Sequence, residues 1–465
     1  MRIRSWVIVN IMMNGRHAYT AGRNHARTSP ALANRQLLPA LPLGIYISVP
    51  FCRTKCSFCN FASNVFSRSV FDRYVQHVCA DIGKTDVIAR ELGGVVEASV
   101  DSIYLGGGTP SVLAAEQLER IFQTVRHNFD IEAGAEITVE CAPGTLNDEI
   151  LAALLRCGVN RVSLGVQSFV DKECSAVGRL HTREVTLDDI RRLRAAGIGN
   201  ISVDLIAGLP HQTTQSWDFS LGEMLATRVP HASIYMLEVD EDSRLGNEVL
   251  AGGSRYHAHF VPDDDLTADL YLAACERLEQ SGLRQYEISN FARPVTHGVG
   301  LWDSRHNLKY WTRRPYLAFG VDAHSMLLAD ELRKSQGVEA VRFATPDSLE
   351  AFSAAEVPEL RIEQLRSSRT FIDEQAALEE SFFLGLRLNR GVSLQQLCSR
   401  FGESAVAYDA VITELVEAGL LEAQANRIRL TARGRLLSNE VFARFIGNDK
   451  PHPTVASDGT FDVTR

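Results

Sequence analysis

Hydrophobic residues follow two alternating spacings along most of the chain. From Gly44 onward, short runs rich in β-branched residues are each followed by a longer stretch whose apolar side chains recur every three or four positions. The short runs predict six strands, over residues 44–49, 100–105, 135–141, 161–166, 201–206 and 231–237. The longer stretches predict a helix after each of the first five strands, including residues 67–92, residues 114–129 and a helix that runs to about Ala196.

This strict alternation of strand and helix predicts an α/β fold with a parallel sheet and helices packed outside it. Six successive units favour a partial (β/α)6 TIM-like barrel, and an open Rossmann-type sheet is the alternative. In both folds, functional sites form at the carboxyl ends of the strands. We therefore expect chemically active residues in the loops that follow the six strands.

The pattern changes after residue 263. It predicts a helix over residues 266–280, a strand over 286–291 and a segment rich in aromatic and basic residues over 302–324. A helix over residues 373–389 precedes short helices and a β-like piece, which is typical of a small winged-helix-like module. The domains we expect are a barrel core (44–262), a barrel extension (263–372), a C-terminal α-rich, winged-helix-like domain (373–446) and a disordered tail (447–465).

The composition is that of a globular protein, with 45% hydrophobic and 23% charged residues among 465. No run of about 18 apolar residues predicts a transmembrane helix. The formal net charge is −9, but residues 1–71 contain nine Lys and Arg and no acidic residue. The rest of the chain therefore carries 39 basic against 57 acidic residues, a net charge of −18, which argues against nucleic acid as a partner.

Residues 1–43 are predicted to be a disordered or targeting extension. Their basic residues are all Arg, set among Ser, Thr, Asn and Ala, which is also the composition of an organelle transit peptide. A short apolar stretch over residues 6–13 is the one sign of an export signal. We expect a cytoplasmic protein, or a mitochondrial matrix protein if the extension is a transit peptide.

Nine cysteines in a chain of this length do not suggest a disulfide framework and fit a reducing compartment. Cys52, Cys56 and Cys59 form a C-x3-C-x2-C motif directly after the first strand. Three thiolates in one loop suit zinc, Cu(I) or an iron–sulfur cluster, but zinc would need a remote fourth ligand, and three unrelated buried cysteines are the structural alternative. The other cysteines are expected to be small buried hydrophobes: Cys79, Cys141, Cys157, Cys174, Cys275 and Cys398.

The cysteine motif is followed, at the second strand, by the sequence Gly-Gly-Gly-Thr-Pro over residues 106–110. Together the two motifs resemble the radical S-adenosylmethionine (SAM) superfamily. The resemblance implies that the three cysteines hold a [4Fe–4S] cluster whose fourth iron is chelated by SAM. It also implies that the following residues surround SAM: Tyr46, Phe58, Gly107, Gly108, Thr109, Glu140, Gln167, Arg179 and Asp204.

Four further segments, at residues 46–52, 165–169, 178–181 and 204–210, resemble the branch that contains oxygen-independent coproporphyrinogen III dehydrogenase and the haem chaperone HemW. The dehydrogenase carries a further Cys two positions after the third, where this chain has Phe61. HemW-like proteins carry a H-N-x-x-Y-W motif, which matches residues 306–311. Both features favour the HemW-like group.

The resemblance gives a haem role to His306, Asn307, Tyr310 and Trp311. A neutral imidazole is a suitable axial ligand of haem iron, and aromatic rings stack well on a porphyrin. Candidates for pairing with haem propionates are Arg305, Lys309, Arg313 and Arg314, and His324 is a second candidate iron ligand. The family more often has Pro-Gly where this chain has Val321-Asp322, and an aromatic segment packed on the barrel edge would give the same pattern.

Three functions compete at this point. The first is a HemW-like haem chaperone, whose partners would be haem, respiratory haem-acceptor proteins and an electron donor for the cluster, with peripheral membrane association compatible with this role. The second is coproporphyrinogen III dehydrogenase, which Phe61 disfavours. The third is a non-catalytic interaction protein that acts through its C-terminal module. We expect the first, and the sequence leaves open whether SAM is cleaved and which oligomer forms.

Overall fold

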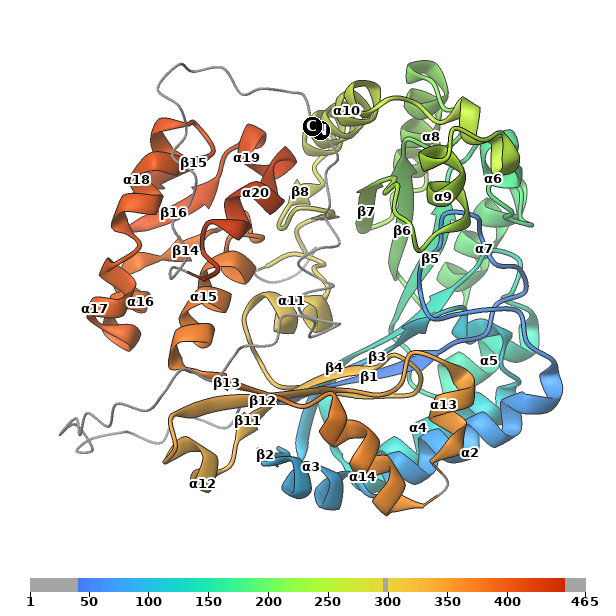
Figure 1. Ribbon diagram of the computed structural model, residues 1–465. Coiled ribbons are helices and arrows are strands. Elements are labelled where there is room, and N and C mark those ends of the chain that lie inside the picture. The colour runs from blue at the N-terminus through green and yellow to red at the C-terminus, as the bar shows by residue number, and fades with distance from the viewer. Residues whose placement is uncertain (1–40, 296–299, 356, 448–465) are drawn as a thin grey trace.

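The computed structural model describes residues 41–295, 300–355 and 357–447, so most of the predicted extension and tail lie outside the described residues. Six parallel strands form the middle of the main sheet (Figure 1). They are β1 (Leu43–Val49), β3 (Ser99–Gly107), β4 (Asp130–Cys141), β5 (Arg161–Gln167), β6 (Asn200–Ala207) and β7 (His231–Met236). All six predicted strands are confirmed, and their carboxyl ends meet at one edge of the sheet.

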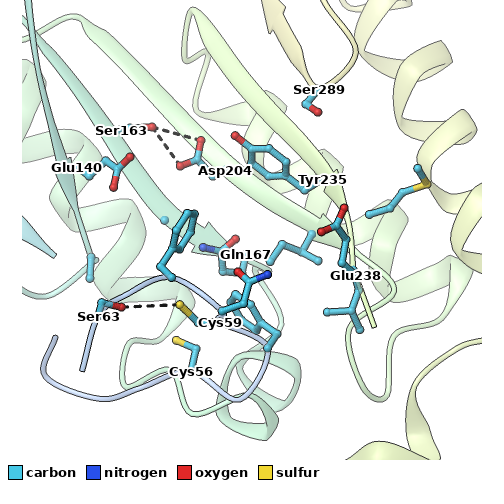
Figure 2. Close-up of a pocket in the computed structure, with 18 of the residues that line it drawn as sticks. Cys56, Cys59, Ser63, Glu140, Ser163, Gln167, Asp204, Tyr235, Glu238 and Ser289 are labelled. Atoms are coloured by element: carbon cyan, nitrogen blue, oxygen red, sulfur yellow. Dashed lines mark hydrogen bonds between the residues drawn. The ribbon is translucent and has the colours of Figure 1, made fainter. Parts of the chain in front are cut away.

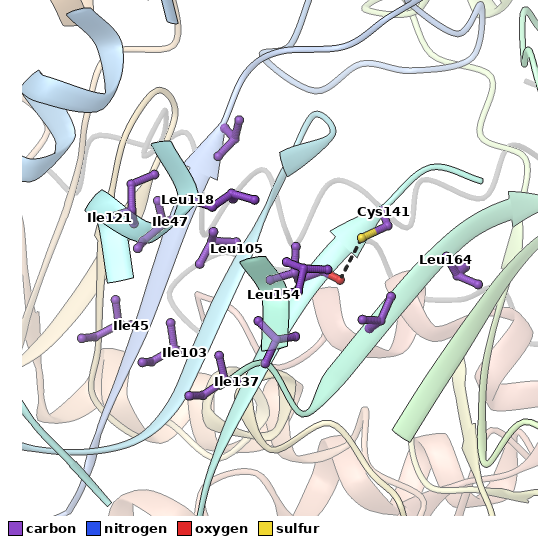
Figure 3. Close-up of a cluster of buried hydrophobic side chains, with 14 of the residues drawn as sticks. Ile45, Ile47, Ile103, Leu105, Leu118, Ile121, Ile137, Cys141, Leu154 and Leu164 are labelled. Atoms are coloured by element: carbon purple, nitrogen blue, oxygen red, sulfur yellow. Dashed lines mark hydrogen bonds between the residues drawn. The ribbon is translucent and has the colours of Figure 1, made fainter. Parts of the chain in front are cut away.

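Helices pack on the outer face of these strands and enclose the main hydrophobic core. Figure 3 shows Ile45 and Ile47 of β1 beside Leu118 and Ile121 of the helix that follows β3, and all four side chains are buried. The covering helices are α2 (Phe71–Ile82), α3 (Thr85–Leu92), α4 (Ala115–Asn128), α5 (Asp148–Arg156), α6 (Asp171–Ala176), α7 (Arg183–Ala195) and α8 (Thr214–Ala226).

Two predicted helices are each divided in the structure. The helix expected over residues 67–92 becomes a 3-10 turn followed by α2 and α3, because Gly83 ends α2. The helix expected to run to Ala196 becomes α6 and α7. The loop between them contains Gly178 at φ +83°, a left-handed conformation that a side chain would disfavour.

The sheet continues past the six parallel strands at both edges. Beyond β1 lie β10 (Tyr316–Phe319), β11 (His324–Ala329), β12 (Val338–Ala344) and β13 (Thr370–Asp373), and beyond β7 lie β9 (Asn290–Ala292) and β8 (Arg284–Gln285). The predicted strand over 286–291 is wrong, because residues 286–289 connect β8 to β9. The path of hydrogen-bonded strands starts at β13 and ends at β8, so the α/β partial barrel is confirmed.

The remaining elements of this part complete the extension. β2 (Gly94–Val95) pairs with β11, and α11 (Arg305–Trp311) packs against both β3 and the first helix of the C-terminal module. The other helices are α9 (Arg244–Leu250), α10 (Asp264–Gln280), α12 (Glu331–Lys334), α13 (Leu349–Ala354) and α14 (Pro358–Ser367). Within the described ranges, no helix is long and apolar enough to cross a bilayer.

The C-terminal module, orange to red in Figure 1, is α-rich as predicted. Its three-stranded sheet has the order β14-β16-β15 and a hydrophobic core that includes Phe382, Phe401 and Tyr408. Its elements are α15 (Glu374–Gly385), β14 (Val392–Ser393), α16 (Leu394–Phe401), α17 (Glu403–Val406), α18 (Asp409–Glu417), β15 (Leu421–Gln424), β16 (Arg427–Leu430), α19 (Ala432–Leu436) and α20 (Ser438–Ala443). The same core includes Tyr316 and Met326 of the main sheet, so the two parts pack as one body.

Candidate functional site

A cavity of about 390 Å³ opens at the carboxyl ends of the parallel strands, where the fold class predicts a site. Figure 2 shows the side chains that point into it. Eight of the nine predicted SAM residues and all three motif cysteines line it: Phe58, Gly107, Gly108, Thr109, Glu140, Gln167, Arg179, Asp204, Cys52, Cys56 and Cys59. Residues from five different strands and the loops that follow them therefore share one chamber.

Backbone hydrogen bonds hold the cysteine loop in place. The N–H of Cys52 donates to the carbonyl of Asn64 at 3.0 Å, and the N–H of Cys59 donates to that of Cys56 at 3.2 Å. The Lys55 ammonium donates to two carbonyls of the same loop, at 2.6 and 2.8 Å. Burial raises the pKa of the Cys52 and Cys56 thiols, while Lys55 and Arg179 lower it, so binding of a cation here would release protons.

The glycine motif approaches this loop closely. The N–H of Gly108 donates to the carbonyl of Val49 and the N–H of Thr109 to that of Phe51, both at 2.8 Å. A Cβ on Gly108 would lie 2.7 Å from the Phe51 carbonyl oxygen, a contact too short for a side chain. Gly107 has φ +99°, which also favours glycine. The motif therefore serves to bring bare backbone up to the start of the cysteine loop.

The three motif thiols do not form the compact donor set of one ion. Over the residues that the structure describes, no group of three or more His, Cys, Asp or Glu side chains could hold a metal ion. A [4Fe–4S] cluster distributes its thiolates over separate iron atoms, so it needs them around one chamber rather than around one point. The three free cysteines on one cavity wall fit that requirement better than a zinc site.

Two carboxyl groups lie across the cavity from the cysteines, on β4 and β6, which β5 separates (Figure 2). Burial raises the pKa of Glu140 to about 7, although the Tyr104 hydroxyl donates to it at 2.8 Å and lowers that pKa. Burial also raises the pKa of Asp204, which accepts from Ser163 at 3.1 Å. A pair of desolvated carboxyl groups of this kind favours a cationic ligand.

The opposite charge comes from Arg179. Its Nε is buried without a hydrogen-bond partner in the described part of the chain, and its guanidinium packs over Gly165, where a Cβ would lie 2.8 Å away. Gln167 lines the cavity too. Its own backbone has φ +70°, and it lies beside a register shift in β5. An orphaned guanidinium nitrogen is suited to a carboxylate ligand. The cavity thus offers both signs of charge, which a zwitterionic amino-acid portion would require.

Tyr46 is the one predicted SAM residue that does not line the cavity. Its ring lies inside the barrel, 6.0 Å from the ring of Tyr104 and 6.2 Å from that of His306. Because Tyr104 in turn bonds Glu140, a column of side chains connects the cavity to the interior of the barrel. The predicted contact of Tyr46 with SAM would therefore be indirect in this conformation.

The H-N-x-x-Y-W segment lies in α11, away from this cavity. His306 is 1% exposed, and its two ring nitrogens are hydrogen-bonded to Ser102 at 3.1 Å and to Tyr310 at 2.9 Å. Burial lowers the pKa of His306 to about 3, which keeps the imidazole neutral. An iron atom would have to displace one of these two hydroxyl partners.

Three of the other groups predicted to bind haem already pair with acidic side chains. Lys309 forms a buried ion pair with Asp101, and Arg313 pairs with Glu380 at 2.8 Å. His324 is buried beside Asp322 at 3.3 Å. Arg305 and Arg314 remain exposed. No continuous surface in this conformation presents the whole predicted haem set.

The six remaining cysteines do not share one environment. Cys141, Cys157 and Cys174 are buried, as predicted. Cys79 and Cys275 are half-buried, and Cys398 is exposed on α16, so the prediction of a buried hydrophobe is wrong there. The helical stripe of α16 buries Leu397 and Phe401, and position 398 lies off that stripe.

Residues that the sequence did not suggest form the far wall of the cavity. They are Tyr235, Glu238, Tyr271, Ile288, Ser289, Arg387 and Arg435. Both arginines belong to the C-terminal module, more than three hundred residues from the cysteines. No local motif marks them, since only tertiary packing brings them to the chamber.

Comparison with known proteins agrees with the geometry. The family model of the radical SAM superfamily matches residues 46–221, and that of the HemN C-terminal domain matches residues 372–437. The structure is similar to that of coproporphyrinogen III oxidase (HemN) from Escherichia coli, with a TM-score of 0.72, 22% identity, and coverage of 88% of this chain and 91% of that one. At this identity the likeness supports the fold.

Sequence relatives cover almost the whole chain. The heme chaperone HemW of Lactococcus lactis is 31% identical over 88% of this chain and 98% of its own length. HemW of Bacillus subtilis is 31% identical over 86% and 98%. A zebrafish (Danio rerio) protein named radical S-adenosyl methionine domain-containing protein 1, mitochondrial, is 30% identical over 77% and 75%. With this identity over nearly its full length, the chain belongs to the HemW family of the radical SAM superfamily.

Proposed function

We propose that this protein is a haem chaperone that binds haem, holds a [4Fe–4S] cluster with SAM, and passes haem to respiratory haem proteins. The observation that carries the proposal is a cavity lined by the three motif cysteines and eight of the nine predicted SAM residues, with Phe61 in its lining where the dehydrogenase branch has a further Cys. The relatives named heme chaperone support it. Its compartment is one that preserves an oxygen-labile cluster, the cytoplasm or a mitochondrial matrix.

Membership of the superfamily implies SAM and a [4Fe–4S] cluster as cofactors. In our proposal Cys52, Cys56 and Cys59 hold the cluster, which supplies one-electron chemistry when an external donor reduces it. Arg179 then binds the SAM carboxylate. The carboxyl groups of Glu140 and Asp204 face the positive charge of SAM. Phe58 packs against the small apolar cluster that includes Ile206 and shields this side of the chamber from water.

Binding of SAM is expected to tighten as the pH rises through about 7. Glu140 has a pKa raised to about 7, so its carboxyl is protonated and neutral below that pH and ionised above it. Because SAM is cationic, it favours the ionised form, and we expect the Kd to fall about tenfold between roughly pH 6 and pH 8. Calorimetric titration measures this. In Glu140→Gln the pH dependence should flatten, and an equally steep profile in that variant would contradict the role of Glu140.

The haem proposal is tested by titrating the anaerobically reconstituted full chain with haem and following the absorption spectrum. We expect stoichiometric binding. His306→Ala separates two roles, since a ligand role predicts a changed spectrum and weaker binding, whereas a purely structural role predicts lower thermal stability with an unchanged spectrum. Absence of stoichiometric binding, or formation of a vinyl-bearing product from coproporphyrinogen III, would overturn the proposed function.

A further inference from the structure

The far wall of the cavity is a second compartment that none of the predicted SAM residues forms. Apolar side chains, among them Met236, Leu237 and Ile288, make up much of it. Two guanidinium groups, of Arg387 and Arg435, interrupt this apolar surface. A compartment of this composition suits a ligand with an apolar body and an anionic edge.

The side chain of Arg387 is buried and held between an aromatic ring and a carboxylate. Its side chain is buried, 8% exposed, with the guanidinium carbon 4.2 Å from the ring centroid of Trp311 and one terminal nitrogen 3.7 Å from Glu287. Its Nε has no hydrogen-bond partner among the described residues. A guanidinium stays ionised even when desolvated, so this nitrogen is a buried donor in need of an acceptor.

Glu287 neutralises the charge of Arg387 only in part, because the Glu287 carboxylate also accepts hydrogen bonds from other donors. Its Oε1 accepts from the N–H of Ser289 at 2.9 Å and from the side chain of Asn290 at 2.5 Å. Glu287 also forms a β-bridge with Leu388, which fixes the backbone next to Arg387. The carboxylate therefore anchors the arginine and leaves donor capacity for a ligand.

Arg435 extends from α19 on the same wall. One of its terminal nitrogens donates to the Leu430 carbonyl at 3.4 Å, and it makes no ion pair with a described residue. Glu238 is the acidic group that faces the compartment beside Glu287, and the hydroxyls of Tyr235 and Tyr271 lie on the same wall. The wall thus carries two guanidinium groups, and the Nε of Arg387 still lacks an acceptor among the described residues.

We propose that Arg387 and Arg435 bind the carboxylate edge of a second ligand of this cavity and that Trp311 is a positioning residue which acts through Arg387. The inference rests on the proposed function, under which this edge carries the propionates of haem. Paired guanidinium donors suit carboxylates in geometry and in charge. The Trp of the H-N-x-x-Y-W motif then serves by stacking on an arginine rather than on a porphyrin.

The test compares haem with its dimethyl ester, which lacks the two carboxylates. We expect the reconstituted full chain to bind the ester about tenfold or more weakly than haem, the effect of losing charged hydrogen bonds. Two variants are used. One is Arg435→Gln, and the other combines Glu287→Gln with Arg387→Gln, which removes both members of the buried pair. In each, haem affinity should fall to the affinity that the unaltered protein has for the ester. Ester affinity itself should not change.

Trp311 is tested by rescue. Trp311→Leu should lose the preference for haem over its ester, and Trp311→Phe should keep most of it, because an aromatic ring still supports the guanidinium. Arg390→Gln is the matched control, since Arg390 is exposed, lies three positions from Arg387 and lines a different pocket.

The possible results separate the two claims. Haem and ester bound equally by the unaltered protein, or a preference that survives the Arg435 and the Glu287 and Arg387 replacements, would overturn the carboxylate site and leave haem binding intact. Absence of stoichiometric haem binding would overturn the proposed function together with the inference. Circular dichroism and thermal unfolding of each variant identify any that fail to fold, and Arg435→Gln, on a half-exposed side chain, then decides.

Discussion

Replacing Cys56 by Ala is expected to abolish the iron–sulfur cluster. In our proposal the cluster has three protein ligands on the loop that follows β1, and two thiolates cannot hold it in the presence of competing thiols and chelators. After anaerobic reconstitution, we expect iron and sulfide contents close to background and the loss of the visible absorption of the cluster. Because SAM would lose its partner on the open iron, its affinity should also fall strongly.

The control for this variant is Cys398→Ala. Cys398 is exposed on α16 in the C-terminal module, so its replacement should leave cluster content and SAM affinity unchanged. If both variants bind iron and sulfide like the unaltered protein, Cys56 is not a ligand. If the unaltered protein instead binds zinc without sulfide, the cluster itself is wrong and the zinc alternative replaces it.

The barrel was predictable because its signal is local. Each strand of the core, such as β1, is a short apolar run, and each following helix repeats its apolar residues at helical spacing. Gly83 and Gly178 were visible as well, but their effect depends on the direction in which the next element leaves the sheet. The strands β10 to β13 were not predicted, because segments such as Val338–Ala344 mix charged and apolar residues and are stabilised by pairing with distant partners.

The candidate site also has a part that the sequence predicts and a part that depends on tertiary packing. The cysteine motif and the glycine motif are each one continuous segment at the end of a strand. Their meeting at one cavity therefore follows from the strand order. The environment of His306 could not be inferred, because its partner Ser102 is about two hundred residues away and the sequence does not report which face of α11 is buried. Arg387 and Arg435 were missed for the same reason, since their position depends on how the C-terminal module packs against the barrel.

The close approach of the glycine motif to the cysteine loop gives the second large effect. A Cβ at position 108 would lie 2.7 Å from the carbonyl oxygen of Phe51, 2.8 Å from that of Val49 and 3.0 Å from the N–H nitrogen of Phe51. All three atoms belong to backbone, which cannot rotate away as a side chain would. Phe51 is buried and immediately precedes Cys52, so any relief of this contact must displace the first cysteine of the loop.

Gly108→Ala is therefore expected to cost about 3 kcal/mol of stability, the upper range for overpacking in a dense core, and to reduce cluster content and SAM affinity together. Thermal unfolding and iron and sulfide analysis after reconstitution measure the two effects. Gly199→Ala is the matched control, because a Cβ there meets no atom within 4 Å, and both readouts should stay unchanged. A Gly108→Ala protein with normal stability and a full cluster would show that the loop tolerates the displacement, and that the motif's closeness to backbone is not what organises the cysteines.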